Sequence, residues 1–180
     1  GQQSTACMFP ALAHAAEAAN AVKAKTRFMV IIGNPPYSGH SANFGEWITK
    51  LVDDYYFVDG SPLGEKNPKW LQDDYVKFIK YGQFCIAQSG TGVFSYVTNH
   101  GYIDNPTFRG MRQNFQRSFS SISVLDLHGN ATKKERAPDG SEDVNVFDIE
   151  QGVAIFTAWR LPNLSTANIK HCDLFGSREY

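Results

Sequence analysis

Five consecutive apolar residues, Phe28 to Ile32, stop at Gly33 and constrain the fold more than any other part of the sequence. The run is short and has no polar side chain that would mark a solvent-facing side. Such a pattern is typical of a strand that is buried on both faces, as in a parallel sheet. The run therefore predicts a strand that is buried on both faces.

The rest of the chain alternates between helical and strand patterns. Helices are predicted at residues 11–25, 44–53, 70–86 and 105–119, and further strands at 93–98, 122–127, 153–159 and 169–174. Strands separated by helices predict an α/β domain with a mostly parallel sheet. Because no helix separates the last two long strands, we expect an antiparallel strand near the C-terminal end. The polar segment 128–144 is expected to be an exposed loop.

The composition fits one globular domain and limits the classes of ligand. The chain has 180 residues, of which 42% are hydrophobic and 19% charged, a balance typical of a folded protein. A net charge of -1 argues against a domain whose whole surface binds nucleic acid, so any basic groove must be local or lie on other residues.

The cysteines and the hydrophobic segments indicate neither a metal site nor a membrane protein. Because Cys7, Cys85 and Cys172 are widely spaced, no zinc site, redox motif or disulfide framework is predicted. The sequence shows no signal peptide and no apolar run long enough to span a bilayer. We therefore expect a cytoplasmic protein with no metal and no membrane partner.

The segment Asn34-Pro35-Pro36-Tyr37 directly follows the apolar run. Ligands of open α/β sheets bind beyond the carboxyl ends of the strands, which is where this segment is expected. Each proline fixes its own φ and keeps the preceding residue extended. What remains is a rigid rim of two acceptors, the side-chain oxygen of Asn34 and the carbonyl oxygen of Pro35, with the aromatic face of Tyr37 beside them.

These groups suit the methylation of an exocyclic amine. The amine of adenine is a poor nucleophile because its lone pair is delocalised into the ring. Two acceptors that bind its two hydrogens favour a pyramidal nitrogen and expose the lone pair to an electrophilic methyl group. Stacking on Tyr37 would hold the base, and such stacking is worth about 1–3 kcal/mol. A target base in a duplex must first be flipped out of the helix. The alternative is an extended turn, or a polyproline ligand for another domain.

Residues Val30 to Tyr37 resemble the catalytic motif of amino-group methyltransferases, which act on adenine N6 in DNA, on protein glutamine or on RNA guanine. Four further blocks are similar to the large restriction–modification polypeptides, of the single-polypeptide type I or type IIG kind, that fuse a helicase-like motor to an adenine methyltransferase: Pro62–Tyr75, Thr98–Arg112, Asp126–Asn130 and Asn145–Ile155. The resemblance therefore favours the DNA enzymes over the protein and RNA enzymes.

The resemblance implies a partial Rossmann-like fold of the S-adenosylmethionine-dependent methyltransferases. Carried over residue by residue, Asn34 and Pro35 would accept the amine hydrogens, Pro36 would help to bind the substrate, and Tyr37 would stack on the base. The family's Gly-rich cofactor loop is not in this sequence, so the cofactor-binding residues stay unassigned. The segment 90–92 is no substitute, because it precedes a strand instead of opening a helix.

The resemblance also implies that residues 1–180 are the C-terminal, catalytic half of one methyltransferase domain from a longer chain. The sequence opens without Met, and Ser177 resembles the start of another helix. The expected partners are DNA, the missing N-terminal half of the domain, and the helicase, nuclease and target-recognition domains of the parent protein. Residues 1–180 alone are expected to be inactive.

A few other residues are candidates for substrate binding. Arg109 and Arg112 could meet DNA phosphates from one side of a helix, although arginines on helix surfaces are more often only solvated. Phe147 could pack on the flipped base opposite the tyrosine of the motif, or could be an ordinary core or loop aromatic. His100 and Asp104 follow a strand near the expected ligand and would either line the pocket or cap a helix.

The expected function is thus site-specific methylation of adenine N6 in DNA, within a restriction–modification system and with S-adenosylmethionine as the methyl donor. Two alternatives remain. The first is an enzyme that methylates protein glutamine or RNA guanine. The second is a truncated, inactive module that keeps the fold and only binds DNA.

Overall fold

The computed structural model describes residues 10–37, 39, 41–65, 68–163 and 166–176. The helices are α2 (Pro10–Lys25), α3 (Glu46–Val52), α4 (Asp74–Ser89) and α5 (Arg109–Ser118). Short 3-10 turns lie at Asp53–Tyr56, Lys69–Gln72, His100–Tyr102 and Pro106–Phe108. The expected helix start at Ser177 lies outside the described residues. None of the described helices is long and apolar enough to cross a membrane.

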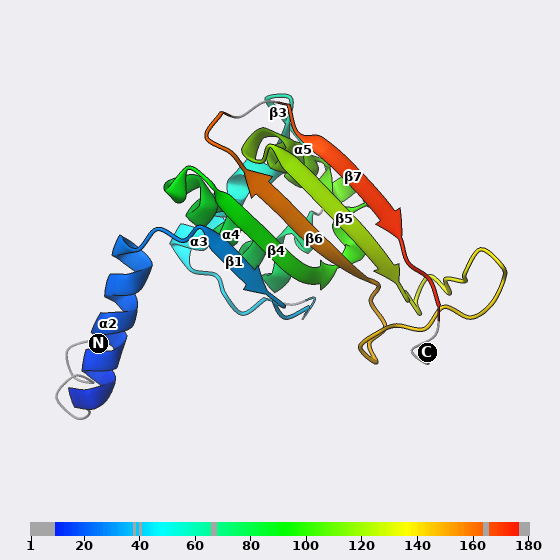
Figure 1. Cartoon of the computed structure of the whole chain (residues 1–180), viewed down its shortest axis with the longest axis horizontal. Coiled ribbons are helices and arrows are strands. Elements are labelled where there is room, and N and C mark those ends of the chain that lie inside the picture. Colours follow the sequence, from blue (N-terminus) through cyan, green and yellow to red (C-terminus); the bar gives the residue numbers. More distant parts are fainter. Residues whose placement is uncertain (1–9, 38, 40, 66–67, 164–165, 177–180) are drawn as a thin grey trace.

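One mixed sheet of five strands forms the centre of the molecule, in the order β1-β4-β6-β5-β7 (Figure 1). Its strands are β1 (Val30–Gly33), β4 (Gly92–Asn99), β5 (Ser121–His128), β6 (Val153–Arg160) and β7 (Asn168–Asp173). A small hairpin adds β2 (Phe57–Val58) and β3 (Ser61–Pro62).

The direction of the strands confirms the predicted sheet. β1 pairs with β4 and β5 pairs with β7 in parallel, whereas β6 is antiparallel to both β4 and β5. The other four strands therefore share one direction, and β6 is the expected antiparallel strand near the C-terminal end. The predicted segments agree with the observed strands to within about two residues at each end.

The hydrophobic core lies between the sheet and helices α3, α4 and α5, which cover one face of it (Figure 1). Side chains alternate along a strand, so Phe94 and Tyr96 of β4 point to the helices together with Phe156 of β6. Gly82 of α4 allows this close packing, because a Cβ there would lie 2.2 Å from a ring carbon of Phe94.

The prediction that the first strand is buried on both faces is wrong. β1 is an edge strand with β4 as its neighbour among the described residues, and no described helix covers the other face of the sheet (Figure 1). Val30 and Ile32 are therefore 61% and 78% exposed. A continuous apolar run indicates that both faces can be covered, but it does not say whether the covering segments belong to the same stretch of chain.

Two other segments depart from a compact α/β layer. Helix α2 points away from the sheet, and its described side chains are mostly exposed (Figure 1). The segment 129–152 contains no helix or strand and connects the carboxyl end of β5 to the start of β6. The exposed loop predicted at 128–144 accounts for most of it, although His128 ends β5 and Asp143 is buried. Both ends of this connection lie at the end of the sheet where β1 and β4 also end, so the loop can contribute side chains to a site at the carboxyl ends of these strands.

Candidate functional site

The motif Asn34-Pro35-Pro36-Tyr37 lies at the carboxyl end of β1, as the sequence predicts. Asn34 and Pro36 are exposed, Pro35 is buried and Tyr37 is half-buried. Gly33 is needed just before the motif, because a Cβ there would lie 2.9 Å from the ring of Tyr96 in the neighbouring strand. Packing against Tyr96 therefore favours glycine at the position where β1 ends and the motif begins.

The tyrosine and the asparagine of the motif are bonded to each other. The Tyr37 hydroxyl donates to the side-chain oxygen of Asn34, the atom expected to accept a substrate amine. Burial raises the pKa of Tyr37 to about 12, so the hydroxyl keeps its proton near neutral pH and can donate. A substrate amine must therefore share or displace this hydroxyl.

A cavity of about 690 Å³ opens beside Tyr37, where the carboxyl ends of β1, β4 and β5 meet. A ligand pocket typically has about 300–1,000 Å³, so this cavity can hold a nucleotide-sized ligand. Its polar wall comes from three separate loops and includes Asp73, Asn99, His100, Asp104 and Asn130. Asn34, Pro35 and Pro36 are not among the residues that line it.

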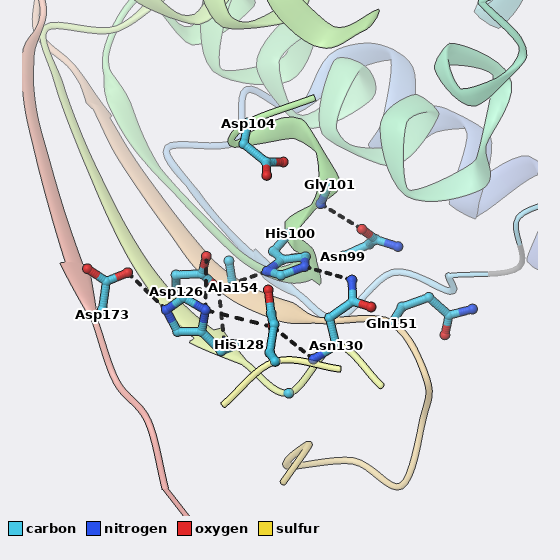
Figure 2. Close-up of polar contacts among 12 residues, drawn as sticks. Asn99, His100, Gly101, Asp104, Asp126, His128, Asn130, Gln151, Ala154 and Asp173 are labelled. Carbon is cyan, nitrogen blue, oxygen red and sulfur yellow. Dashed lines mark hydrogen bonds and ion pairs between the residues drawn. The ribbon is translucent and has the colours of Figure 1, made fainter. Parts of the chain in front are cut away.

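His100 lies almost fully buried in the cavity wall, with 4% of its surface exposed. Its Nδ1 is 3.0 Å from the carboxylate of Asp126, and its Nε2 is 3.1 Å from the side-chain nitrogen of Asn130 (Figure 2). The carboxylate can only accept, so Nδ1 carries the proton and Nε2 accepts from Asn130. Gly152 closes over the ring, because a Cβ there would lie 2.2 Å from it.

The Asp126 carboxylate holds a larger cluster together. Burial opposes its charge, but hydrogen bonds from His100 and from the backbone N–H of His128 together lower its pKa below the ordinary value. His128 in turn bonds through Nε2 to Asp173 at 2.9 Å (Figure 2). These bonds connect the ends of β4, β5 and β7.

Three of these side chains are of the types that bind metal ions. Ligand atoms of His100, Asp126 and His128 lie within 4.8 Å of one another, which is close enough for one ion. However, both ring nitrogens of His100 already have protein partners, Asp126 and Asn130. The hydrogen-bonded arrangement therefore accounts for the geometry without an ion.

Two amides of the cavity wall have fixed orientations. The Asn99 side-chain oxygen accepts from the backbone N–H of Gly101 at 2.7 Å, and caps the turn that follows β4. The Asn130 side-chain oxygen accepts from the backbone N–H of Lys133 at 3.0 Å. A backbone N–H can only donate, so in both cases the oxygen and the nitrogen of the amide are assigned.

Two carboxylates complete the polar wall. Asp104 forms an ion pair of 2.9 Å with Lys133 at the rim, and the hydrogen bond from Lys133 lowers the pKa of this carboxyl. Asp73 is 5% exposed, and its Oδ1 has no hydrogen-bond partner among the described residues. Burial raises the pKa of Asp73.

Residues 6–132 match the family described as Eco57I restriction-modification methylase. The chain belongs to this family. No curated protein matches the chain.

Solved structures show the same fold. The ATP-dependent Type ISP restriction-modification enzyme LlaBIII bound to DNA is 30% identical with a TM-score of 0.74, and the match covers 87% of this chain and 11% of that one. A DrdV–DNA complex is 27% identical with a TM-score of 0.71, covering 88% and 16%. The chain thus spans only a small part of these much longer chains. A nuclease-deletion mutant of the Type ISP enzyme LlaGI, 22% identical with a TM-score of 0.65, shares the fold.

The two arginines predicted to bind DNA make contacts within the chain itself. Arg109 donates to the Glu65 carboxylate at 2.8 Å and to a backbone carbonyl. Arg112 donates to the carbonyls of Tyr102 and Asn105 at 2.8 and 2.9 Å. Neither lines the cavity. Arg112 holds the loop that forms one of the cavity walls, and a direct phosphate contact stays a prediction for both arginines.

Phe147 lies in the loop between β5 and β6, with 44% of its surface exposed, and does not line the cavity. Its backbone N–H donates to the side chain of Asn145. Packing on a flipped base therefore stays a prediction that requires the loop to move. His100 and Asp104, by contrast, do line the pocket, which is the first of the two roles expected for them.

Sequence reasoning did not find the group formed by His100, Asp126 and Asn130. His100 is separated from the other two by 26 and 30 residues, and the carboxyl ends of two strands, β4 and β5, bring them together. The only signal was position, since each residue is at or just beyond the carboxyl end of a predicted strand, where ligands bind in α/β sheets.

Proposed function

We propose that this chain is the catalytic half of an S-adenosylmethionine-dependent DNA methyltransferase that acts on adenine N6 in a restriction–modification system. The observation that carries the proposal is the position of Asn34-Pro35-Pro36-Tyr37 at the carboxyl end of β1, with Tyr37 in the wall of a cavity that can hold a nucleotide. Membership in the restriction-modification methylase family supports it.

The motif would act on the amine through two acceptors. The amine of a flipped adenine would donate one hydrogen to the Asn34 side-chain oxygen and the other to the Pro35 carbonyl. Since both oxygens are fixed before the base arrives, they would stabilise the pyramidal nitrogen as it develops positive charge. Neither residue needs to act as a strong base.

Tyr37 would have two functions in the same step. Its ring would stack on the base, and its hydroxyl, which donates to Asn34 in the free protein, would give way to the incoming amine. This exchange replaces one hydrogen bond to Asn34 by another, so Asn34 has a partner both before and after the base enters.

The cofactor would supply the electrophilic methyl group. The described residues include no Gly-rich loop that opens a helix after a strand, since Gly90 ends α4 and Gly92 begins β4. We assign the main cofactor site to an N-terminal half of the domain, which would join the sheet at the free edge of β1. Asn34 is exposed at the end of that strand, and can therefore be reached from the added half.

The partners of the chain would be DNA and the other domains of a long polypeptide, namely a helicase, a nuclease and a target-recognition domain. LlaBIII is described as ATP-dependent and bound to DNA, and DrdV as a DNA complex. The chain matches 11% and 16% of those proteins, which leaves room for such domains. Residues 1–180 alone would be inactive.

The test is methyl transfer from labelled S-adenosylmethionine by the full-length polypeptide that contains this chain, offered DNA, protein and RNA in parallel. We expect label on adenine N6 of DNA and its near-complete loss in Asn34→Ala, with DNA binding retained. Asn163→Ala, in the exposed turn after β6 at the opposite end of the sheet, is the matched control. Label on protein or RNA would contradict the substrate, and no label on any of the three would support an inactive module.

A further inference from the structure

We infer that Asn99 and Asn130 read the target base by donating fixed N–H groups to its ring nitrogens, and that His100, held by Asp126, sets the orientation of Asn130. The inference rests on the proposed function and deepens it, because it assigns the groups that distinguish the base beyond its reactive amine.

Asn99 can offer only donors to a ligand. Its side-chain oxygen is engaged by the backbone N–H of Gly101 at 2.7 Å. Figure 2 shows the amide nitrogen of Asn99 directed away from Gly101. Because the residue lines the cavity, the N–H groups of this nitrogen are the polar atoms that it can present there.

Asn130 is restricted in the same way by two partners. Its oxygen accepts from the backbone N–H of Lys133, and its nitrogen donates one hydrogen to His100 Nε2. One N–H of Asn130 is left for a ligand in the cavity. A rotated amide would lose both contacts, so the neighbouring groups determine which end faces the cavity.

His100 can accept from Asn130 because Asp126 accepts the hydrogen bond of Nδ1–H, which keeps the proton on Nδ1 and leaves Nε2 as the acceptor. The ring cannot turn freely, since Gly152 packs against Cε1 and Nε2 so closely that no Cβ would fit. Asp126 therefore determines which ring nitrogen of His100 accepts, and that nitrogen in turn fixes the orientation of the Asn130 amide in the cavity wall (Figure 2). His100 is a positioning residue in this scheme, because it acts through Asn130.

These donors complement the part of adenine that the motif does not bind. Adenine has donors only on N6, which Asn34 and Pro35 would accept, and its remaining polar atoms N1, N3 and N7 are all acceptors. The Asn99 and Asn130 donors are of the kind that such ring nitrogens need. A site built for a substrate's polar groups discriminates strongly against analogues that lack them.

A base fits this wall better than a phosphate does. The carboxylates of Asp73 and Asp104 line the same cavity, and would repel an anion. Lys133, the cation at the rim, is already paired with Asp104 at 2.9 Å. We therefore assign the amide donors to a neutral base.

The test combines isosteric variants with altered DNA. Asn99→Asp and Asn130→Asp keep the oxygen that binds Gly101 or Lys133, so the backbone contacts survive while the donor is removed. Each full-length variant is assayed for methyl transfer to DNA whose target is adenine or a deaza-adenine that lacks N1, N3 or N7. Asn99→Ala and Asn130→Ala repeat the test without the added charge.

We expect at least one deaza target to lower kcat/KM of the wild type by roughly tenfold or more. The same target should cause little further loss in the variant that lacks the matching donor, and His100→Ala should reproduce the selectivity of Asn130→Asp. Asp53→Asn, an exposed aspartate at the end of α3 that lies outside this cavity wall, should stay close to the wild type.

The inference would be overturned if each deaza target lowered kcat/KM by the same factor in the wild type and in all variants. Adenine methylation by the wild type and its loss in Asn34→Ala would still uphold the proposed function in that case. A penalty from a neutral methylphosphonate that disappears in the Asn99 or Asn130 variants would also overturn it, because the amides would then bind the backbone. If the wild type does not methylate adenine at all, the proposed function itself fails.

Discussion

The Tyr37 hydroxyl donates to the side-chain oxygen of Asn34, three residues earlier in the chain. The bond gives the exposed asparagine a fixed orientation before any substrate arrives, and it occupies the atom on which the proposed chemistry depends. The two roles of Tyr37, stacking and holding, are carried by different parts of the side chain and can be separated.

Replacing Tyr37 by phenylalanine keeps the ring and removes the hydroxyl. We expect Tyr37→Phe to change kcat/KM for DNA by less than about fivefold, because stacking is retained and Asn34 no longer has a partner to exchange. Tyr37→Ala removes the stacking surface, worth about 1–3 kcal/mol, and should lower kcat/KM by roughly 5- to 150-fold. Steady-state methyl transfer by the full-length polypeptide measures both. Equal losses in the two variants would show that the hydroxyl, and not the ring, matters.

The close contact between Gly152 and His100 makes a prediction for stability. A methyl group at position 152 would lie 2.2 Å from the imidazole, which is itself enclosed, so Gly152→Ala should destabilise the protein by about 1–3 kcal/mol. Urea denaturation followed by circular dichroism gives the value. Gly45→Ala is the matched control, since its Cβ would come no closer than 3.4 Å to a neighbour. Equal unfolding midpoints for the two variants would mean that His100 can move aside.

The Asp126 carboxylate links stability to pH. Its pKa is lower in the folded protein than in the unfolded chain, because hydrogen bonds from His100 and His128 outweigh the effect of burial. The charged form is therefore favoured by folding, and its contribution to stability is fully present above the unfolded pKa of about 3.9 and is lost as the pH falls through the folded value.

Unfolding midpoints in urea, measured from pH 6 down to pH 3, should therefore fall more steeply for the wild type than for Asp126→Asn. Asp53→Asn, an exposed aspartate at the end of α3, serves as the control and should follow the wild type. A wild-type curve that runs parallel to that of Asp126→Asn would show that this carboxylate does not carry the acid sensitivity.

Local patterns predicted the motif well, but not the wall that faces it. The segment from Gly33 to Tyr37 is rigid by its own sequence, since its prolines fix the backbone, and a preceding apolar run places it at a strand end. His100, Asp126 and Asn130 each look unremarkable in their own segments. Their meaning depends on β6 lying between β4 and β5, an order that no local pattern encodes.

The error at β1 has a similar cause. The apolar run from Phe28 to Ile32 correctly indicates a strand with two apolar faces, yet Val30 and Ile32 are exposed here. A sequence pattern records what a strand is suited to contact, and the contact itself depends on segments elsewhere.

The arginines show that a pattern typical of ligand binding can also serve contacts within the chain. Arg109 and Arg112 look like phosphate ligands along a helix, but their guanidinium groups contact Glu65 and backbone carbonyls.

Salt dependence separates the two roles of Arg112. If Arg112 holds the cavity wall through the carbonyls of Tyr102 and Asn105, Arg112→Leu should lower the free energy of unfolding by about 1–3 kcal/mol, because two part-buried acceptors lose their donor. DNA binding would then weaken without a change in its salt dependence. A phosphate contact predicts instead that the slope of log K against log salt becomes shallower by about one. DNA-binding titrations of the full-length polypeptide at several salt concentrations decide between them.

Arg117→Leu, which removes a more exposed arginine of the same helix, controls for the loss of charge. Since Arg112 donates to both carbonyls, we expect the unchanged slope and a lower stability.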